Sequence, residues 1–166
     1  MAKEHERRFL CKKKLIPANL PYADIQQGYV YFDDTKQIRV RIEKNVIGLS
    51  DNSTSTFEKA SFAIKFEGTE RDEYEYDILL ADGKEILAKC FYTLTKRRYT
   101  TTHQGCTVHI DDFGDEIIAE IETPTKDHKF IPPRYFGKEV TGIKKHSNIQ
   151  KAIKQSKFKV VKEWTK

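Results

Sequence analysis

Apolar and charged residues alternate along several segments of this chain. In each segment the apolar side chains occupy one parity and the charged or polar side chains occupy the other. Successive side chains of a strand point to opposite faces, so the pattern predicts strands with one apolar and one charged face. It occurs in residues 38–43, 62–67, 73–78 and 116–122. Together these segments predict a mainly antiparallel sheet.

The first residues of the chain space their charges in the same way. In a strand, Glu4, Glu6 and Arg8 project from one face, which places two carboxylates beside a guanidinium. An apolar core would not accept this face, because unpaired buried charges are costly to desolvate. A site that holds a divalent cation next to a phosphate needs such a mixture. We therefore expect this strand to form part of an active site, with His5 on its outer face.

Turn residues and apolar spacing place the remaining elements. Further strands are predicted around residues 27–32, 92–103 and 107–113. Residues 50–56, rich in Ser, Thr and Asn, predict an exposed hairpin tip.

Helices are predicted at two places. One begins at Asp82 as N-cap and runs to about Phe91, and another begins at Ser147 and includes Ile149, Ala152 and Ile153. The tail from Lys157 is expected to add an edge strand or to lie on the surface.

These elements predict an α+β fold, an eight-stranded antiparallel β-barrel with a few flanking helices. About eight strands are enough to close a barrel. If the charged faces point inward, the lumen is a wet, charged tunnel and the apolar faces pack against helices outside. The alternative for any one strand is a solvated face on a two-layer sheet. Several strands with Glu-x-Glu and Arg-x-Arg pairs favour the tunnel.

Composition indicates a globular chain of 166 residues, most simply one domain over residues 1–166. No stretch approaches the ~20 apolar residues of a membrane span, and the N-terminus lacks the apolar core of a secretion signal. We expect a cytoplasmic protein without a membrane partner. Cys11, Cys90 and Cys106 are scattered and odd in number, which fits free thiols in a reducing compartment. The formal charge of +5 indicates an anionic partner, either nucleic acid or a small polyanion.

An ordered series of short motifs resembles the CYTH, or triphosphate tunnel metalloenzyme, superfamily. The opening resembles its Glu-x-Glu-x-Lys signature, and the chain is similar in length to the small bacterial members that hydrolyse inorganic tripolyphosphate. The resemblance runs from residue 4 to about residue 153. Its further motifs are Gln27-Gly28-Tyr29, Arg39-Val40-Arg41, Phe62-Ala63-Ile64-Lys65, Glu73-Tyr74-Glu75, Lys96-Arg97-Arg98-Tyr99, Asp111-Asp112-Phe113, Glu120-Ile121-Glu122 and Phe136-Gly137-Lys138-Glu139-Val140-Thr141.

The resemblance implies a tunnel that binds triphosphate lengthwise together with one or two Mg²⁺ or Mn²⁺ ions. The positions that match metal-site carboxylates are Glu4, Glu6, Glu120 and Glu122, with Asp111 a weaker candidate. The positions that match phosphate-binding basic residues are Arg39, Arg41, Lys65 and Arg98. Glu75 matches an acidic position expected to orient a basic neighbour. Tyr29 and Lys96 match a Tyr–Lys pair implicated in activity, in which Lys96 either lowers the pKa of Tyr29 or orients it.

Triphosphate chemistry requires this mixture of charges. Tripolyphosphate carries about four to five negative charges near neutral pH, and guanidinium forks bind phosphate oxygens bidentately. Carboxylates alone would repel the anion, but a hard divalent cation between them makes them part of its binding site. In a loose phosphoryl transition state, catalysis is mostly positioning and charge stabilisation. One metal ion would neutralise the phosphate chain, while a second ion or the acidic cluster would activate the attacking water.

Two departures from the superfamily pattern affect rate and substrate choice. Arg8, counted here with the catalytic candidates, replaces the signature lysine and differs from it in reach and hydration. The terminal segment, usually an aromatic residue before Ser-Asn, is His146-Ser147-Asn148, with Lys145 where Arg is common.

Metal-dependent hydrolysis of inorganic tripolyphosphate, with nucleoside triphosphates as weaker substrates, is the first interpretation. The alternatives are a class IV adenylyl cyclase, a thiamine or RNA triphosphatase, and a non-catalytic polyphosphate- or nucleotide-binding module. The partner is then a small-molecule triphosphate, and a homodimer is left open. Three basic segments suggest nucleic acid, namely Lys12-Lys13-Lys14, Lys96-Arg97-Arg98 and the Lys-rich tail, but no RNA-recognition or helix-turn-helix signature supports that partner.

Overall fold

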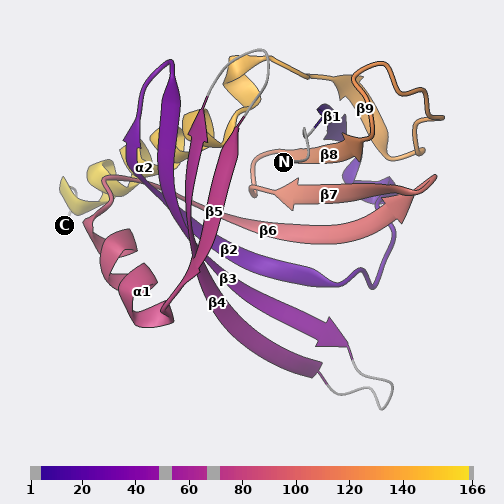
Figure 1. Cartoon of the computed structure of the whole chain (residues 1–166). Coiled ribbons are helices and arrows are strands. Elements are labelled where there is room, and N and C mark those ends of the chain that lie inside the picture. The colour runs from indigo at the N-terminus through magenta and orange to yellow at the C-terminus, as the bar shows by residue number, and fades with distance from the viewer. Residues whose placement is uncertain (1–4, 49–53, 67–71, 165–166) are drawn as a thin grey trace.

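The computed structural model describes residues 5–48, 54–66 and 72–164, and its strands form one strongly curved sheet (Figure 1). The strands are β1 (His5–Cys11), β2 (Tyr22–Phe32), β3 (Lys36–Gly48), β4 (Thr54–Phe66), β5 (Glu73–Ile78), β6 (Tyr92–His103), β7 (Cys106–Asp112), β8 (Ile117–Thr123) and β9 (Phe136–Glu139). The helices are α1 (Leu80–Lys89) and α2 (Asn148–Trp164), with 3₁₀ turns at Lys13–Leu15 and Lys144–His146. Strand order is β5-β4-β3-β2-β6-β7-β8-β1-β9.

The antiparallel register carries one parity of side chains across the whole sheet. Tyr29 of β2 lies opposite Arg39 of β3, and Arg39 lies opposite Ala63 of β4. At the other end of the sheet, Arg8 of β1 lies opposite Glu120 of β8. Directly opposed residues point to the same side of a sheet. The charged parity predicted from the sequence is therefore continuous from strand to strand and lines the concave face.

The convex face of β1, β7 and β8 holds the larger apolar core. Phe9, Val108, Ile110 and Ile121 are buried there and are covered by the segment that leads into β9. The ring of Phe136, the first residue of β9, stacks on Phe9 with centroids 4.6 Å apart. Burial of these side chains stabilises the fold while leaving the opposite face of the same strands free for charges.

Helix α1 covers the convex face of β2, β3 and β4, and two glycines allow its close approach. A Cβ atom added to Gly83 of α1 would lie 2.5 Å from the Cβ of Ala60 on β4. A Cβ added to Gly28 of β2 would lie 2.7 Å from the Cβ of Cys90, just after the helix. At both positions the glycine backbone therefore packs directly against a side chain of the other element, which places α1 outside the sheet as expected.

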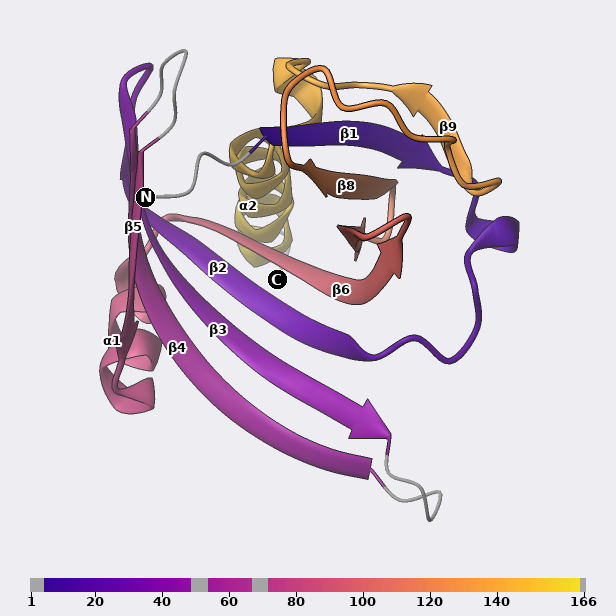
Figure 2. The same ribbon diagram turned by 45° about the vertical axis from the view of Figure 1, so that its right-hand side comes forward.

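Helix α2 lies inside the curve of the sheet, and Figure 2 shows it between β5 and β8. The expectation that all helices pack outside the sheet was therefore wrong. Ala152 packs against Tyr29 and Leu94, two residues of the concave parity. β7 pairs with β6 only from residue 97 onward, so no described strand pairs with residues 92–96 on the side away from β2.

Side chains of α2 supply the missing partners of that edge. The Gln155 amide accepts a hydrogen bond from the Thr95 N–H at 2.8 Å and donates to the Thr95 carbonyl at 3.1 Å. Ser156 Oγ accepts from the Thr93 N–H at 3.0 Å. Satisfying these backbone groups explains why the helix lies against β6.

Several predicted boundaries differ from the structure. α1 begins at Leu80 rather than Asp82, and its N-cap residue Leu79 makes no side-chain capping bond. Residues 54–56, predicted in a hairpin tip, are strand; residues 50–53 lie outside the described residues. Ser147 does cap α2, because its Oγ accepts from the Gln150 N–H at 3.3 Å.

The tail from residue 157 is not an edge strand, because α2 continues to Trp164. Once a helix is nucleated, each added residue contributes one more backbone hydrogen bond, which favours its continuation.

The predicted closed barrel of eight strands also differs from the structure. Among the described residues the sheet has nine strands, and no hydrogen-bonded ladder joins the edge strands β5 and β9. β9 was not predicted, because its four residues show no alternation; it forms by pairing with Phe9 and Cys11 of β1. This pairing occupies part of the β1 edge. No helix in the described part of the chain combines the length and apolarity needed to cross a membrane.

Removing a convex-face side chain should destabilise the protein strongly. Ile110 is fully buried, so Ile110→Ala should lower the free energy of unfolding by about 2–5 kcal/mol through lost burial and a residual cavity. Ile131 is 75% exposed, and Ile131→Ala should change it by less than about 0.5 kcal/mol. Urea unfolding measures both variants, and equal losses would contradict this placement of the core.

Candidate active site

Charged side chains line the concave face of the sheet in two groups. The first group, on β1, β6, β7 and β8, consists of Glu6, Arg8, Lys96, Arg98, Asp111 and Glu120. The second group, on β3, β4 and β5, consists of Arg39, Arg41, Glu43, Lys65, Glu73 and Glu75. The structure thus brings together the predicted site residues that it describes. Glu4 lies outside the described residues.

Asp111 is the centre of the first group. Its carboxylate accepts hydrogen bonds from Lys96 Nζ at 2.6 Å and from Arg98 Nε and Nη2 at 2.7 Å each. Burial acts to raise the pKa of Asp111, but Arg98 and Lys96 hold it well below its usual range. Burial is the main cause that lowers the pKa of Lys96 to about 8, and the positive charge of the nearby Arg98 is the second. This ion cluster is dry, since Lys96 and Asp111 are almost completely inaccessible.

Arg8 joins the carboxylates of β1 and β8. Its Nε donates to Glu6 and lies 3.2 Å from Glu120 Oε1, while Arg98 Nη2 donates to the other oxygen of Glu120 at 2.9 Å. Burial and the charge of Glu120 raise the pKa of Glu6. The Glu6–Glu120 pair therefore carries an unfavourable like-charge interaction that a cation would relieve.

The cations of the second group are paired less completely with hydrogen-bond acceptors than those of the first. Arg39 Nη2 donates to Glu73 at 2.8 Å, and Arg41 Nη1 lies 3.2 Å from Glu43. Arg39 Nε is buried and has no hydrogen-bond partner among the described residues. Burial and the neighbouring Arg41 lower the pKa of Arg39, and burial with Arg39 lowers that of Lys65. These cations would be stabilised by an additional anion.

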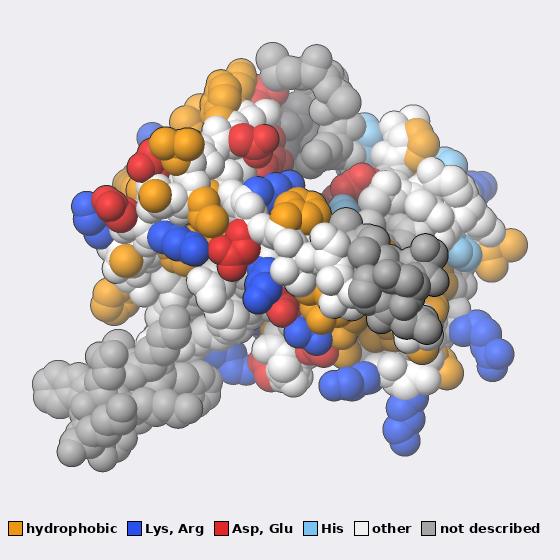
Figure 3. All heavy atoms as spheres, turned by 90° about the horizontal axis from the view of Figure 1, so that it is seen from below, with side chains coloured by type: hydrophobic (Ala, Val, Ile, Leu, Met, Phe, Trp, Pro, Cys, Tyr) orange, Lys and Arg blue, Asp and Glu red, His pale blue; other side chains and the backbone are white. Residues whose placement is uncertain are grey.

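The two groups face one another across the concave space. The charge of Lys65 on β4 opposes the rise in the pKa of Glu6 on β1, although these strands lie near opposite edges of the sheet. The charge of Arg41 on β3 likewise acts on Lys96 of β6. Seen from below, basic and acidic side chains adjoin one another along a band across the middle of the face (Figure 3). Curvature therefore produces one charged space from distant strands.

Tyr29 lies deep in this space, but the predicted contact with Lys96 is not among its interactions. The side chain of Gln27 donates a hydrogen bond to Tyr29 Oη at 2.8 Å. Lys96 Nζ instead donates to Asp111 and, at 3.2 Å, to Asn148 Oδ1 of α2. Burial raises the pKa of Tyr29 to about 12, so a lowered pKa, one of the two alternatives given for the effect of Lys96, is not found. Burial in a low-dielectric site disfavours the phenolate more than the nearby cations favour it.

The carboxylates fit a hard divalent cation by donor type. Glu6, Glu120 and Glu122 share the concave parity of β1 and β8, and Glu6 lies directly opposite Glu122. Among the described residues, no group of three acidic, His or Cys side chains is close enough to hold an ion without other ligands. Mg²⁺ is usually bound by one or two carboxylates with phosphate oxygens and water, which this donor set allows. Glu122 currently pairs with His109 Nε2 at 3.4 Å.

Several residues of the site were not singled out from the sequence. Glu73 is a closer partner of Arg39 than Glu75 is, at 2.8 Å against 3.6 Å. Both have the concave parity and belong to one quoted motif, in which only Glu75 was given a role. Gln27 lay within a quoted motif without a role. Asn148 follows the predicted cap of α2, and only the inward position of that helix brings it to Lys96.

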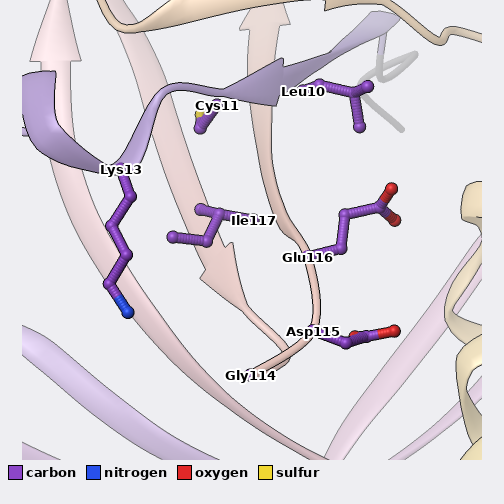
Figure 4. Close-up of a pocket in the computed structure, with 7 residues that line it drawn as sticks. All are labelled: Leu10, Cys11, Lys13, Gly114, Asp115, Glu116 and Ile117. Carbon is purple, nitrogen blue, oxygen red and sulfur yellow. The ribbon is translucent and has the colours of Figure 1, made fainter.

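A separate shallow pocket of about 330 Å³ lies between the end of β1 and the β7–β8 turn (Figure 4). The carboxylates of Asp115 and Glu116 point away from Lys13 there. Asp115 is paired with Lys154 at 2.6 Å, and Glu116 with Lys151 at 2.8 Å. Because these acids are already neutralised, the concave space is the better candidate site.

Comparison with known proteins agrees with this geometry. No family model matches the chain. Over 154 residues the chain is 32% identical to an inorganic triphosphatase of Acetivibrio thermocellus, and the match covers 89% of this chain and 92% of that protein. The chain belongs to the inorganic triphosphatase family.

The solved structure of the inorganic triphosphatase NE1496 matches this member of the family with a TM-score of 0.63 and 25% identity. That match covers 92% of this chain and 96% of the other. A putative adenylate cyclase from Bacillus halodurans shares the fold, with a TM-score of 0.51, 14% identity and coverage of 77% and 85%. The predicted membership of the CYTH superfamily is confirmed.

Breaking the Asp111 cluster should destabilise this triphosphatase-family fold. Asp111→Asn leaves Lys96 and Arg98 buried with less counter-charge and should lower the free energy of unfolding by about 3–5 kcal/mol. Asp24 pairs with Arg97 on the solvent side, and Asp24→Asn should cost less than about 1 kcal/mol. Denaturant titration measures both variants.

The free energy of unfolding that is lost in Asp111→Asn should also depend on pH. The pKa of Asp111 is lower in the folded chain, so the unfolded chain binds this proton first as the pH falls through about 4. The contribution of Asp111 is therefore complete at neutral pH and declines in acid. A difference between wild type and Asp111→Asn that stays constant from neutral to acid pH would contradict this account.

Proposed function

We propose that the chain hydrolyses inorganic tripolyphosphate to pyrophosphate and phosphate in the charged concave space, with Mg²⁺ or Mn²⁺ as cofactor. The water oxygen bonds to a terminal phosphorus, and the bridging oxygen leaves with pyrophosphate. Family membership supports this activity, since the relative from Acetivibrio thermocellus is an inorganic triphosphatase.

The buried guanidinium of Arg39 is the observation that carries the proposal. Its side chain is 7% exposed, and its Nε donor has no partner among the described residues. A buried donor without a partner costs free energy, and phosphate oxygens are strong acceptors for guanidinium forks. Arg41 and Lys65 lie on the same face, so a linear polyanion would meet several cations in succession.

The remaining predicted residues take roles that follow from their contacts. Glu73 and Glu75 hold Arg39, and Ser61 Oγ donates to Glu75 at 2.7 Å, which fixes the orienting carboxylate. Arg8, Lys96 and Arg98 are supported by carboxylates on the other side of the space. They would stabilise the charge that develops on the phosphoryl oxygens as the bond breaks.

Glu6, Glu120 and Glu122 are the residues proposed to hold the metal ion, with Asp111 behind them as the partner of Lys96 and Arg98. The raised pKa of Glu6 beside Glu120 supports a cation at this position. When bound, the ion would neutralise phosphate charge and polarise the attacked group. Glu4 would extend the carboxylate row in sequence, but it lies outside the described residues.

Arg39 should be required for turnover. Arg39→Met removes a buried phosphate donor and should lower kcat/KM for tripolyphosphate by roughly 100-fold. Arg97 has 43% of its side chain exposed and pairs with Asp24, so Arg97→Met is the matched control and should stay within about twofold. Phosphate release is measured with Mg²⁺, with Mn²⁺ and with EDTA.

The same assay separates the alternatives. Turnover of tripolyphosphate that EDTA stops supports the proposal. Binding without turnover would indicate a polyphosphate-binding module, and cyclic AMP with pyrophosphate from ATP would indicate a cyclase. Faster release from thiamine triphosphate or an RNA 5′-triphosphate than from tripolyphosphate would replace the proposed substrate.

Metal binding should depend on the β8 carboxylates. Glu122 is 47% exposed, so Glu122→Gln should leave the fold intact while weakening Mn²⁺ binding by about tenfold or more. The control Glu58→Gln removes a partly exposed carboxylate paired with Lys84 on another part of the sheet. Electron paramagnetic resonance of free Mn²⁺ measures affinity without turnover. Unchanged affinity in Glu122→Gln would remove this residue from the metal site.

A further inference from the structure

Gln27 is a fully buried polar side chain in the middle of the charged space. It belongs to β2, lies opposite Arg41 on one side and Leu94 on the other, and has no exposed surface. The preceding residue, Gln26, points to the opposite face and is exposed. A buried amide is stable only when its donors and acceptor have partners. The partners of Gln27 are Arg41 and Tyr29.

The chemistry of the two partners fixes the orientation of the amide. Arg41 Nε can only donate, and it lies 3.3 Å from Gln27 Oε1. The amide oxygen must therefore face Arg41, which directs the amide N–H groups toward Tyr29. The contact from Gln27 Nε2 to Tyr29 Oη is 2.8 Å. With the amide flipped, two donors would face each other at Arg41.

This orientation decides what Tyr29 can do. Because its oxygen accepts from Gln27, the Tyr29 hydroxyl must direct its own proton elsewhere. Burial raises the pKa of Tyr29 to about 12, so the group keeps that proton at neutral pH. The charges of Arg39, Arg41 and Arg8 all act on Tyr29. Its hydroxyl therefore lies where cations from both sides of the space converge.

We propose that Gln27 is a positioning residue that makes Tyr29 a hydrogen-bond donor to a phosphate oxygen of the bound triphosphate. The inference rests on the proposed function, because it needs a polyanion among Arg8, Arg39 and Arg41. Gln27 does not touch the substrate; it holds the phenol by its oxygen and thereby directs the O–H toward the anion. Tyr29 then acts as a neutral donor and not as a phenolate base.

A double-mutant cycle tests the inference. Gln27→Met keeps the length of the side chain but removes both hydrogen bonds, and it should lower kcat for tripolyphosphate about tenfold with a smaller change in KM. Tyr29→Phe should lower kcat by at least as much. Since Gln27 acts through Tyr29, Gln27→Met should cost less than twofold in the Tyr29→Phe background. The kcat of the control Gln26→Met should stay within twofold of that of the wild type.

A third variant separates the Tyr29 contact from the Arg41 contact. In Gln27→Glu the carboxylate still accepts from Arg41, but it also accepts the Tyr29 proton that the substrate would need. Its kcat should fall at least as far as that of Gln27→Met. Thermal unfolding of every variant shows whether the fold is retained. A loss of kcat is interpreted only for variants whose unfolding temperature matches that of the wild type.

Three results would overturn the inference: full kcat in Gln27→Met, full kcat in Gln27→Glu, or losses of Gln27→Met and Tyr29→Phe that multiply. A wild-type protein without turnover would instead contradict the proposed function. In that case the same cycle is measured calorimetrically as tripolyphosphate affinity in EDTA. Each single variant should then bind several-fold more weakly, and independent losses would again reject the role of Gln27.

Discussion

Buried cations that must find counter-charges determine the arrangement of this protein. The side chain of Lys96 is inaccessible and that of Arg98 is largely buried; both pair with the carboxylate of Asp111, and Arg98 has Glu120 as a second partner. An unpaired charge at this depth would cost several kcal/mol, so the positions of β6 and β7 are coupled through that cluster. The convex apolar core stabilises the same strands from the other side. Charge pairing within the curve and apolar burial outside it therefore support one curved sheet.

The two sides of the charged space differ in how fully their cations are paired. Arg98 donates two hydrogen bonds to Asp111 and one to Glu120, whereas Arg39 keeps an Nε without a partner among the described residues and has a lowered pKa. A triphosphate anion gains most where cations lack partners, and a divalent cation gains most beside Glu6 and Glu120. The asymmetry gives the anion and the metal ion different preferred sides of one space, which suits a reaction that depends on positioning.

Helix α2 links the end of the chain to this chemistry. Ala152 packs on Tyr29, Asn148 accepts a hydrogen bond from Lys96, and Gln155 pairs with the backbone of β6. A helix on the convex face would make none of these contacts. Its inward position follows from the unpaired edge of β6 beside residues 92–96, where backbone groups need partners that β7 does not provide.

The alternation along the chain determined which residues share the concave face. Strand periodicity is local, so Arg39, Arg41, Lys65 and Glu75 could be assigned to one face before any pairing was known. Together with turn residues and apolar spacing, it identified most strands, including β6 with both of its bounds. Only the tertiary structure decided which charges pair, because register and curvature bring β1 within electrostatic reach of β4. The preference of Arg39 for Glu73, the partners of Lys96, the inward position of α2 and the open edges of the sheet all depend on contacts between distant segments, which alternation within a strand does not encode.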